Sequence, residues 1–234
     1  MARRCFLLFV LAPLLACAQP AFEVASIKPA DPNANGTYTR TNPNGVTLEN
    51  FSLKDCIERA FDVKDFSLEA PGWLAEARFN IAAKAPDGAS RKQFNSMLRT
   101  LLIERFKLAF HHETKVMPAY ALVVDKRGLK IAPTQPGETG WGSGRGMLDG
   151  FRLPMAEFAG LLAELVDRPV KDMTGLDGVF NTKLRWNPEG AADPALPTSI
   201  FTALEEQAGL RLDARKLPVE ILVVDQIQRQ PAEN

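Results

Sequence analysis

The side chains best suited to acid–base or metal chemistry form one triplet, His111-His112-Glu113, which holds the only two histidines of the chain. Histidine can act as a general base or as a metal ligand near neutral pH. However, adjacent residues of a β-strand point to opposite faces, so the two imidazoles cannot readily bind one metal ion. A catalytic zinc site also takes three protein ligands. We therefore predict no catalytic residue, no cofactor and no metal site. We retain His111, His112 and Glu113 as a candidate functional surface, in which a histidine acts at best as a pH-sensitive group.

The three cysteines are Cys5, Cys17 and Cys56. Cys56 follows the helical spacing of the apolar residues around it, which predicts a buried small side chain rather than a nucleophile. The other two lie in the N-terminal segment, so we expect no internal disulfide in the body of the chain.

The first 18 residues have the order of parts found in a secretory signal peptide. Arg3 and Arg4 precede a short apolar run, and residues 16–18 (Ala-Cys-Ala) form a small-residue cleavage site. The run is too short to span a membrane comfortably. Residues 14–17 (Leu-Leu-Ala-Cys) also resemble a bacterial lipobox, which would leave a lipidated Cys17 at the mature N-terminus. Both alternatives predict an extracytoplasmic protein, secreted or periplasmic, with a membrane anchor only in the second case.

Composition sets broad limits on the partner. Lys and Arg number 28, as do Asp and Glu, so the formal net charge is zero. A chain without excess positive charge lacks the electrostatic footprint of a nucleic-acid-binding protein, and we predict no such partner. The length of 234 residues is enough for one large domain or two small ones.

One apolar segment occurs twice in the sequence. Residues 118–125 (Pro-Ala-Tyr-Ala-Leu-Val-Val-Asp) return 100 positions later as residues 218–225 (Pro-Val-Glu-Ile-Leu-Val-Val-Asp), with five of eight residues identical. This period is much longer than that of a solenoid repeat. It predicts two copies of one small α+β unit, each ending in a buried strand.

Helix signals are strongest after two serines. Ser52 and Ser90 each precede an amphipathic stripe, with Asp55 and Gln93 at the third helical position as in a capping box. Two further helices are expected, one after Pro154 and one after residue 198 or 199. The last should stop near residue 209, which is a glycine.

Alternation of apolar and polar residues predicts the strands. We expect a possible edge strand over 22–29, an exposed loop over 30–45 and further strands over 46–51, 66–70, 78–84, 169–172 and 179–186. Two antiparallel hairpins should close the two copies, the first from strands 107–113 and 119–125, the second from strands 210–212 and 219–227.

The segment 126–146 is rich in Gly and Pro and predicts a linker. Its residues 142–146 (Gly-Ser-Gly-Arg-Gly) invite comparison with a phosphate-binding loop or a nucleophile elbow, but no strand leads directly into them and no Gly-Lys-Ser/Thr ending is present.

The predicted fold class is α+β, with two tandem copies of a mainly antiparallel sheet that carries two helices on one face. The predicted organisation is a signal peptide over 1–18, an N-terminal strand and loop over 19–45, a first repeat over 46–125, the linker over 126–146 and a second repeat over 147–230.

Several stretches together resemble the soil-associated protein family, a domain of unknown function found as paralogues in acidobacteria. The resemblance spans nearly all of the mature chain and is carried by residues 22–29 (FEVASIKP), 101–108 (LLIERFKL), 120–124 (YALVV), 168–176 (RPVKDMTGL), 199–204 (SIFTAL), 218–220 (PVE) and 233–234 (EN).

The resemblance implies no established activity and no catalytic residues. Related domains are attached to membrane metallopeptidases of the antibiotic-sensing type, which implies an extracytoplasmic sensing or interaction role. This chain lacks the HExxH motif of those peptidases. We therefore expect an exported, non-enzymatic module that binds a protein or cell-envelope partner, through exposed sheet edges or a cleft. The alternative is an extracytoplasmic hydrolase with a site between the two repeats.

Overall fold

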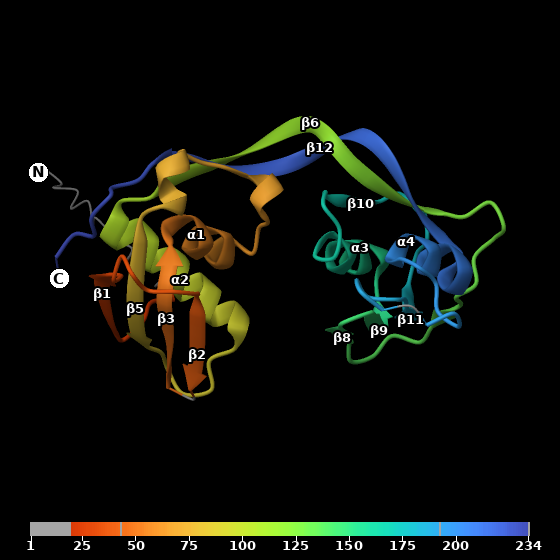
Figure 1. Cartoon of the computed structure of the whole chain (residues 1–234), viewed down its shortest axis with the longest axis horizontal. Helices are drawn as coiled ribbons and strands as arrows, with labels where there is room; N and C mark the ends of the chain where they lie inside the picture. The colour runs from red at the N-terminus through yellow and green to blue at the C-terminus, as the bar shows by residue number, and fades with distance from the viewer. Residues whose placement is uncertain (1–19, 43, 192, 234) are drawn as a thin grey trace, which may run out of the picture. The chain divides into compact units, whose positions relative to one another are not determined.

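The computed structural model describes residues 20–42, 44–191 and 193–233. The predicted signal peptide and Cys17 lie outside these ranges. The described residues form an α+β fold with mostly antiparallel strands, as the sequence predicted. The chain divides into two compact units (Figure 1). Unit 1 holds residues up to 62, 72–108 and 227 onward, and unit 2 holds 63–71 and 109–226.

Unit 1 is built on a four-stranded antiparallel sheet in the order β1-β5-β3-β2. Its elements are β1 Val24–Pro29, β2 Tyr38–Asn42, β3 Gly45–Ser52, α1 Leu53–Phe61, the short helix η2 Gly72–Ala75, β5 Arg78–Lys84 and α2 Arg91–Phe106. The strand β1 lies at an edge of this sheet. The segment 30–45, expected as a loop, contains β2.

Helices α1 and α2 begin where their capping signals predicted. Ser52 and Ser90 each accept a hydrogen bond from the third helical N–H, and the side chains of Asp55 and Gln93 accept from the cap N–H in return. Such a cap stabilises a helix by about 1 kcal/mol. Alternate residues of β5 are buried, and the ring of Phe106 in α2 lies 5.2 Å from the ring of a buried phenylalanine of that strand. One face of the sheet is therefore covered.

Unit 2 contains a second four-stranded antiparallel sheet, in the order β7-β11-β9-β8. Its elements are β7 Pro133–Thr134, β8 Gly140–Gly144, β9 Met147–Leu153, α3 Met155–Ala163, β11 Val179–Arg185, α4 Ile200–Ala203 and the π-helical turn η3 Leu204–Ala208. The segment 126–146, which we expected to be a linker, thus supplies two strands. Gly209 follows η3 in the left-handed conformation, as predicted for a helix stop.

The two strands that carry the repeated sequence pair with each other. β6 Ala109–Val124 and β12 Leu210–Gln226 form a long antiparallel ribbon, drawn at the top of Figure 1. Short parallel strands flank it, β10 Val170–Asp172 beside β6 and β4 Leu68–Glu69 beside β12, and the short helix η1 Asp65–Ser67 precedes β4. The predicted hairpins over 107–125 and 210–227 are therefore wrong. Each segment is one continuous strand, because its intervening polar residues pair across the ribbon instead of forming a turn.

The register of the ribbon is centred on the repeat. Met117 lies opposite Leu217, Pro118 opposite Lys216 and Pro218 opposite Val116. Two residues that are 100 positions apart in the sequence therefore lie equally far from the central pair, towards opposite ends of the ribbon. The two four-stranded sheets also correspond in order when their strands are matched along the chain. The predicted repeat boundaries do not coincide with the compact units, since β6 belongs to unit 2.

Among the described helices, none combines the length and the apolar character that a membrane crossing requires.

Candidate functional site

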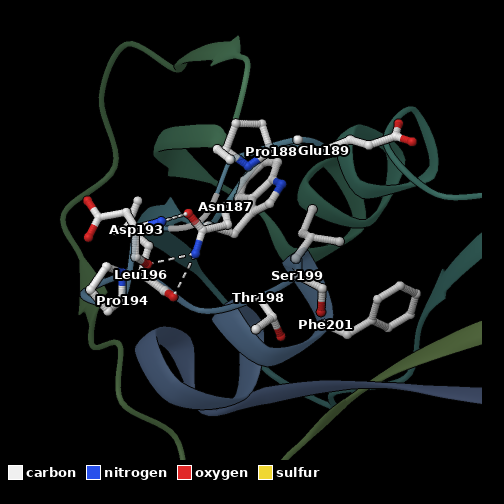
Figure 2. A pocket seen from close by; sticks show the side chains of 13 residues that line it. Asn187, Pro188, Glu189, Asp193, Pro194, Leu196, Thr198, Ser199 and Phe201 are labelled. Carbon is white, nitrogen blue, oxygen red and sulfur yellow. Dashed lines mark hydrogen bonds between the residues drawn. The ribbon is translucent and has the colours of Figure 1, made fainter.

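A depression of about 810 Å³ lies on unit 2, between the loop that follows β11 and the start of α4. This volume is within the range of ligand-binding sites, which is about 300 to 1,000 Å³. Figure 2 shows Asn187 and Asp193 at one side of it and the ring of Phe201 projecting from α4 at the other. The described lining residues are Trp186, Asn187, Pro188, Glu189, Gly190, Ala191, Asp193, Pro194, Leu196, Thr198, Ser199, Ile200 and Phe201.

The side chain of Asn187 holds the loop in shape. Its Nδ2 donates to the carbonyl oxygens of Asp193 at 2.8 Å and Leu196 at 3.1 Å, and its Oδ1 accepts from the N–H of Asp193 at 2.9 Å (Figure 2). The backbone N–H of Asn187 donates to the carbonyl of Pro197 at 2.8 Å. One amide thus ties together both ends of this loop, and these bonds shape the depression.

The inner end of the depression is fixed by the sheet. The N–H of Trp186 donates to the carbonyl of Gly146 at 3.0 Å. Gly146 has φ of +77°, and a Cβ there would lie 2.5 Å from the carbonyl oxygen of Trp186. Only glycine fits this position, at the turn between β8 and β9.

The hydroxyl of Ser199, which lies in the lining of the depression, has a structural role. Ser199 caps α4: its Oγ accepts from the N–H of Thr202 at 3.3 Å and lies 3.3 Å from the Thr202 hydroxyl. Among the described lining residues there is no histidine, cysteine or lysine, and the two carboxylates are those of Glu189 and Asp193.

An aromatic and charged cluster adjoins the depression. The ring of Phe201, which is 37% exposed, lies 5.5 Å from the ring of Tyr120 in an edge-to-face arrangement. The Tyr120 hydroxyl donates to Asp167 at 3.2 Å, and the guanidinium of Arg168 lies 5.3 Å from the Tyr120 ring. Burial and the negative charge of Asp167 raise the pKa of Tyr120. Burial opposes ionisation of Asp167, but the hydrogen bond and charge of Arg168 outweigh it and lower the pKa of this carboxyl.

The candidate triplet lies elsewhere, near the start of β6. His111 and His112 point to opposite faces of the ribbon, as expected from strand geometry. His111 Nδ1 lies 2.8 Å from Asp225 and His112 Nδ1 lies 3.4 Å from Glu220, and all four side chains are about half exposed or more. Glu113 lies 3.7 Å from the Nζ of Lys115. The histidines therefore face solvent, not a buried carboxylate in a cleft, and the hydrolase alternative loses its best candidates.

The structure also places the other residues that the sequence analysis considered. Cys56 is fully buried in α1, and burial raises the pKa of its thiol to about 12, so it has no nucleophilic role. Residues 142–146 form part of β8 and the turn into β9. In the part of the chain that the structure describes, no three His, Cys, Asp or Glu side chains lie close enough to hold a metal ion.

Sequence reasoning did not find the depression. Residues 187–197 have the composition of a polar, proline-rich loop, and Phe201 lies with Ile200 and Leu204 in an apolar stripe at helical spacing. The stripe is accurate for Ile200 and Leu204, which are buried, but Phe201 lies on the exposed side of the same turn.

Residues 54–227 match the model of a family described as a protein of unknown function (DUF3738). No curated protein and no solved structure matches the chain.

Proposed function

The chain belongs to the DUF3738 family of proteins of unknown function, and we propose that it is an exported, non-enzymatic binding protein. Its ligand contact is the depression beside α4, which accepts an apolar or aromatic group of a protein or cell-envelope partner. The observation that carries this proposal is the composition of the depression: exposed apolar side chains lie around the side chains of Asn187 and Ser199, which are engaged in the protein's own hydrogen bonds.

The apolar part of the lining provides the binding energy. Trp186, Pro188, Leu196 and Phe201 are at least partly exposed around the depression. Removing about 100 Å² of apolar surface from water contributes about 2.5 kcal/mol. Aromatic contacts add about 0.5–1.5 kcal/mol each. A single inserted side chain therefore suffices for a measurable interaction, while the partner's remaining surface sets the specificity.

Two polar side chains of the lining shape the depression. Asn187 and Ser199 are held in place by the hydrogen bonds described above, so both serve as fixed parts of its wall. The π-turn η3 directly after α4 is a feature that recurs at functional sites.

A neutral apolar probe tests the depression directly. N-phenyl-1-naphthylamine should bind the full chain saturably, with a rise in its fluorescence. Phe201→Ser should weaken binding about tenfold, because it removes one aromatic contact of roughly 1.4 kcal/mol. Phe151→Ser is the matched control, since Phe151 is 49% exposed on β9 and outside the depression. Equal affinity for wild type and Phe201→Ser would contradict the proposal.

The natural partner is then sought in envelope extracts with the same three proteins. A component retained by wild type and Phe151→Ser, but not by Phe201→Ser, is a ligand of this site. Circular dichroism of each variant establishes that the fold is intact.

Export is a separate part of the proposal, supported by the order of parts in residues 1–18. Cell fractionation should place the protein outside the cytoplasm. Mass spectrometry of its N-terminus distinguishes a chain that starts at Gln19 from one that starts at a lipidated Cys17. Recovery of the intact N-terminus in the cytoplasm would refute export.

A further inference from the structure

A second depression, of about 520 Å³, lies on unit 1 between the end of α1 and the first half of α2. Its lining is mostly polar and consists of Ala60, Phe61, Asp62, Arg91, Lys92, Asn95, Ser96 and Arg99. Three of these side chains are cationic and one is anionic. Among the described residues, no Asp or Glu forms an ion pair with Arg91, Lys92 or Arg99.

The placement of Arg91 and Lys92 is electrostatically unfavourable for the protein alone. They occupy the first two positions of α2, where the helix dipole places positive charge. Acidic side chains are favoured there, and α1 follows the rule with Asp55 in its first turn. In α2 the first turn has no acidic residue, and its capping box uses the neutral Gln93. The sequence thus concentrates positive charge at a helix end that already carries it.

A further arginine adds to this concentration. Arg59, in the last turn of α1, is half-buried and donates from Nη1 to the Thr39 hydroxyl at 3.1 Å. Burial and then repulsion by Arg91 lower the pKa of its guanidinium.

Arg99 is held in a fixed orientation at the rim. Its Nη2 donates to the carbonyl of Ala60 at 3.3 Å, and its guanidinium carbon lies 4.3 Å from the centre of the Phe61 ring. These two contacts use one nitrogen and one face of the guanidinium, which leaves further N–H groups for a ligand.

We propose that this depression binds an oxyanion, the phosphate or carboxylate group of an extracytoplasmic ligand, between Arg91, Lys92 and Arg99. The anion relieves the repulsion among these cations and the unfavourable interaction with the helix dipole. Three basic side chains against one acidic side chain, Asp62, explain why an anion is preferred to a cation. This site is independent of the apolar depression on unit 2, so either can fail without the other.

The test measures binding of inorganic phosphate and of citrate to the full chain by calorimetry, at an ionic strength held constant with sodium chloride. The double variant Arg91→Gln/Lys92→Gln should bind roughly a hundredfold more weakly, at about tenfold for each charge-assisted contact. The control, Lys126→Gln/Lys171→Gln, removes the same charge from exposed sites on unit 2 and should bind as wild type. Tighter binding of phosphate identifies a phosphate-bearing ligand, and tighter binding of citrate a carboxylate-bearing one.

A second measurement, thermal unfolding, distinguishes an anion-binding role of Arg91 and Lys92 from a structural role. Without anion, Arg91→Gln/Lys92→Gln should unfold at a higher temperature than wild type, because it removes repulsion. The proposal is overturned if neither anion binds saturably, or if both double variants lose affinity equally. It is also overturned if the Arg91→Gln/Lys92→Gln variant is less stable and still binds as wild type does.

Discussion

Replacing Asp149 with alanine should destabilise unit 2 more than the loss of an ordinary surface ion pair. Asp149 lies on β9 and Arg185 on the neighbouring strand β11. Nη1 of Arg185 donates to Oδ1 at 2.6 Å and Nη2 donates to Oδ2 at 2.8 Å, a two-pronged contact with a carboxylate that is 12% exposed. Both hydrogen bonds are charge-assisted, and Arg185 lowers the pKa of Asp149.

The magnitude follows from the unequal exposure of the two groups. Breaking a buried ion pair costs about 3–5 kcal/mol because a charge stays buried without its partner. The Arg185 side chain is 39% exposed, however, and water can solvate its guanidinium after Asp149 is removed. Exposed pairs contribute only about 0–1 kcal/mol. We therefore expect about 2 kcal/mol for Asp149→Ala, and a larger loss for Arg185→Met, which leaves the less exposed carboxylate alone.

The assay is urea unfolding followed by tryptophan fluorescence in a Trp73→Phe background, where both remaining tryptophans lie in unit 2. Glu164→Ala is the control, because its pair with Lys64 is 4.0 Å long and more than 40% exposed on both sides. An Asp149→Ala loss no larger than that of Glu164→Ala would refute the reasoning. So would a smaller loss for Arg185→Met than for Asp149→Ala.

The pH dependence of this pair has a definite sign. The folded-state pKa of Asp149 is lowered, so its stabilisation is fully present above the unfolded-state value of about 4. The stabilisation is lost as the pH falls through the lower folded-state pKa. Wild type should consequently lose more stability than Asp149→Ala between neutral pH and strongly acidic pH.

Three further predictions concern backbone and thiol positions. Gly209→Ala should lower the free energy of unfolding by more than about 2 kcal/mol, because φ is +66° and the new Cβ would lie 2.2 Å from a loop carbonyl. Gly160→Ala, in an exposed turn of α3 with nothing near the new Cβ, should instead raise the free energy of unfolding by about 1 kcal/mol. Thermal unfolding compares the two variants. Pro118→Ala with Pro218→Ala should leave the fold intact and increase self-association, measured by sedimentation velocity, because both changes add a hydrogen-bond donor to a strand edge. Cys56 should react with a thiol reagent only after unfolding in urea, and rapid labelling of the native chain would contradict its burial.

The sequence predicted local structure accurately where the interactions of neighbouring residues determine it. The capping boxes at Ser52 and Ser90, the strand over 78–84 and the stop at Gly209 were all predicted, because each depends on neighbouring residues alone. Burial of Cys56 followed in the same way from helical periodicity.

Long-range pairing was not accessible in this way. Segments 107–125 and 210–227 each have a polar middle. From the sequence alone, such a middle is equally consistent with a hairpin turn and with the exposed centre of a long strand. The structure has the second arrangement because each segment finds the other as partner. Both proposed ligand sites depend on such tertiary placement. A net charge of zero concealed the local excess around Arg91 and Lys92, just as the apolar stripe concealed the exposure of Phe201.

The two repeated prolines narrow the ways in which the ribbon can bind a partner. The N–H of Tyr120 and the carbonyl of Leu122 bond outward to the segment around β10, so the even-numbered residues of β6 present their backbone groups to the edge. Pro118 is one of them, and Pro218 holds the same position on β12 because it pairs with Val116. Neither proline removes a hydrogen bond from the ladder, and each deletes a donor midway along an open edge.

Addition of a partner strand, which we first expected at exposed edges, is thereby disfavoured at the centre of both strands. The depressions on units 1 and 2 are accordingly better candidates for partner binding, and the 100-residue spacing of the two prolines favours the hypothesis that both strands descend from one duplicated segment.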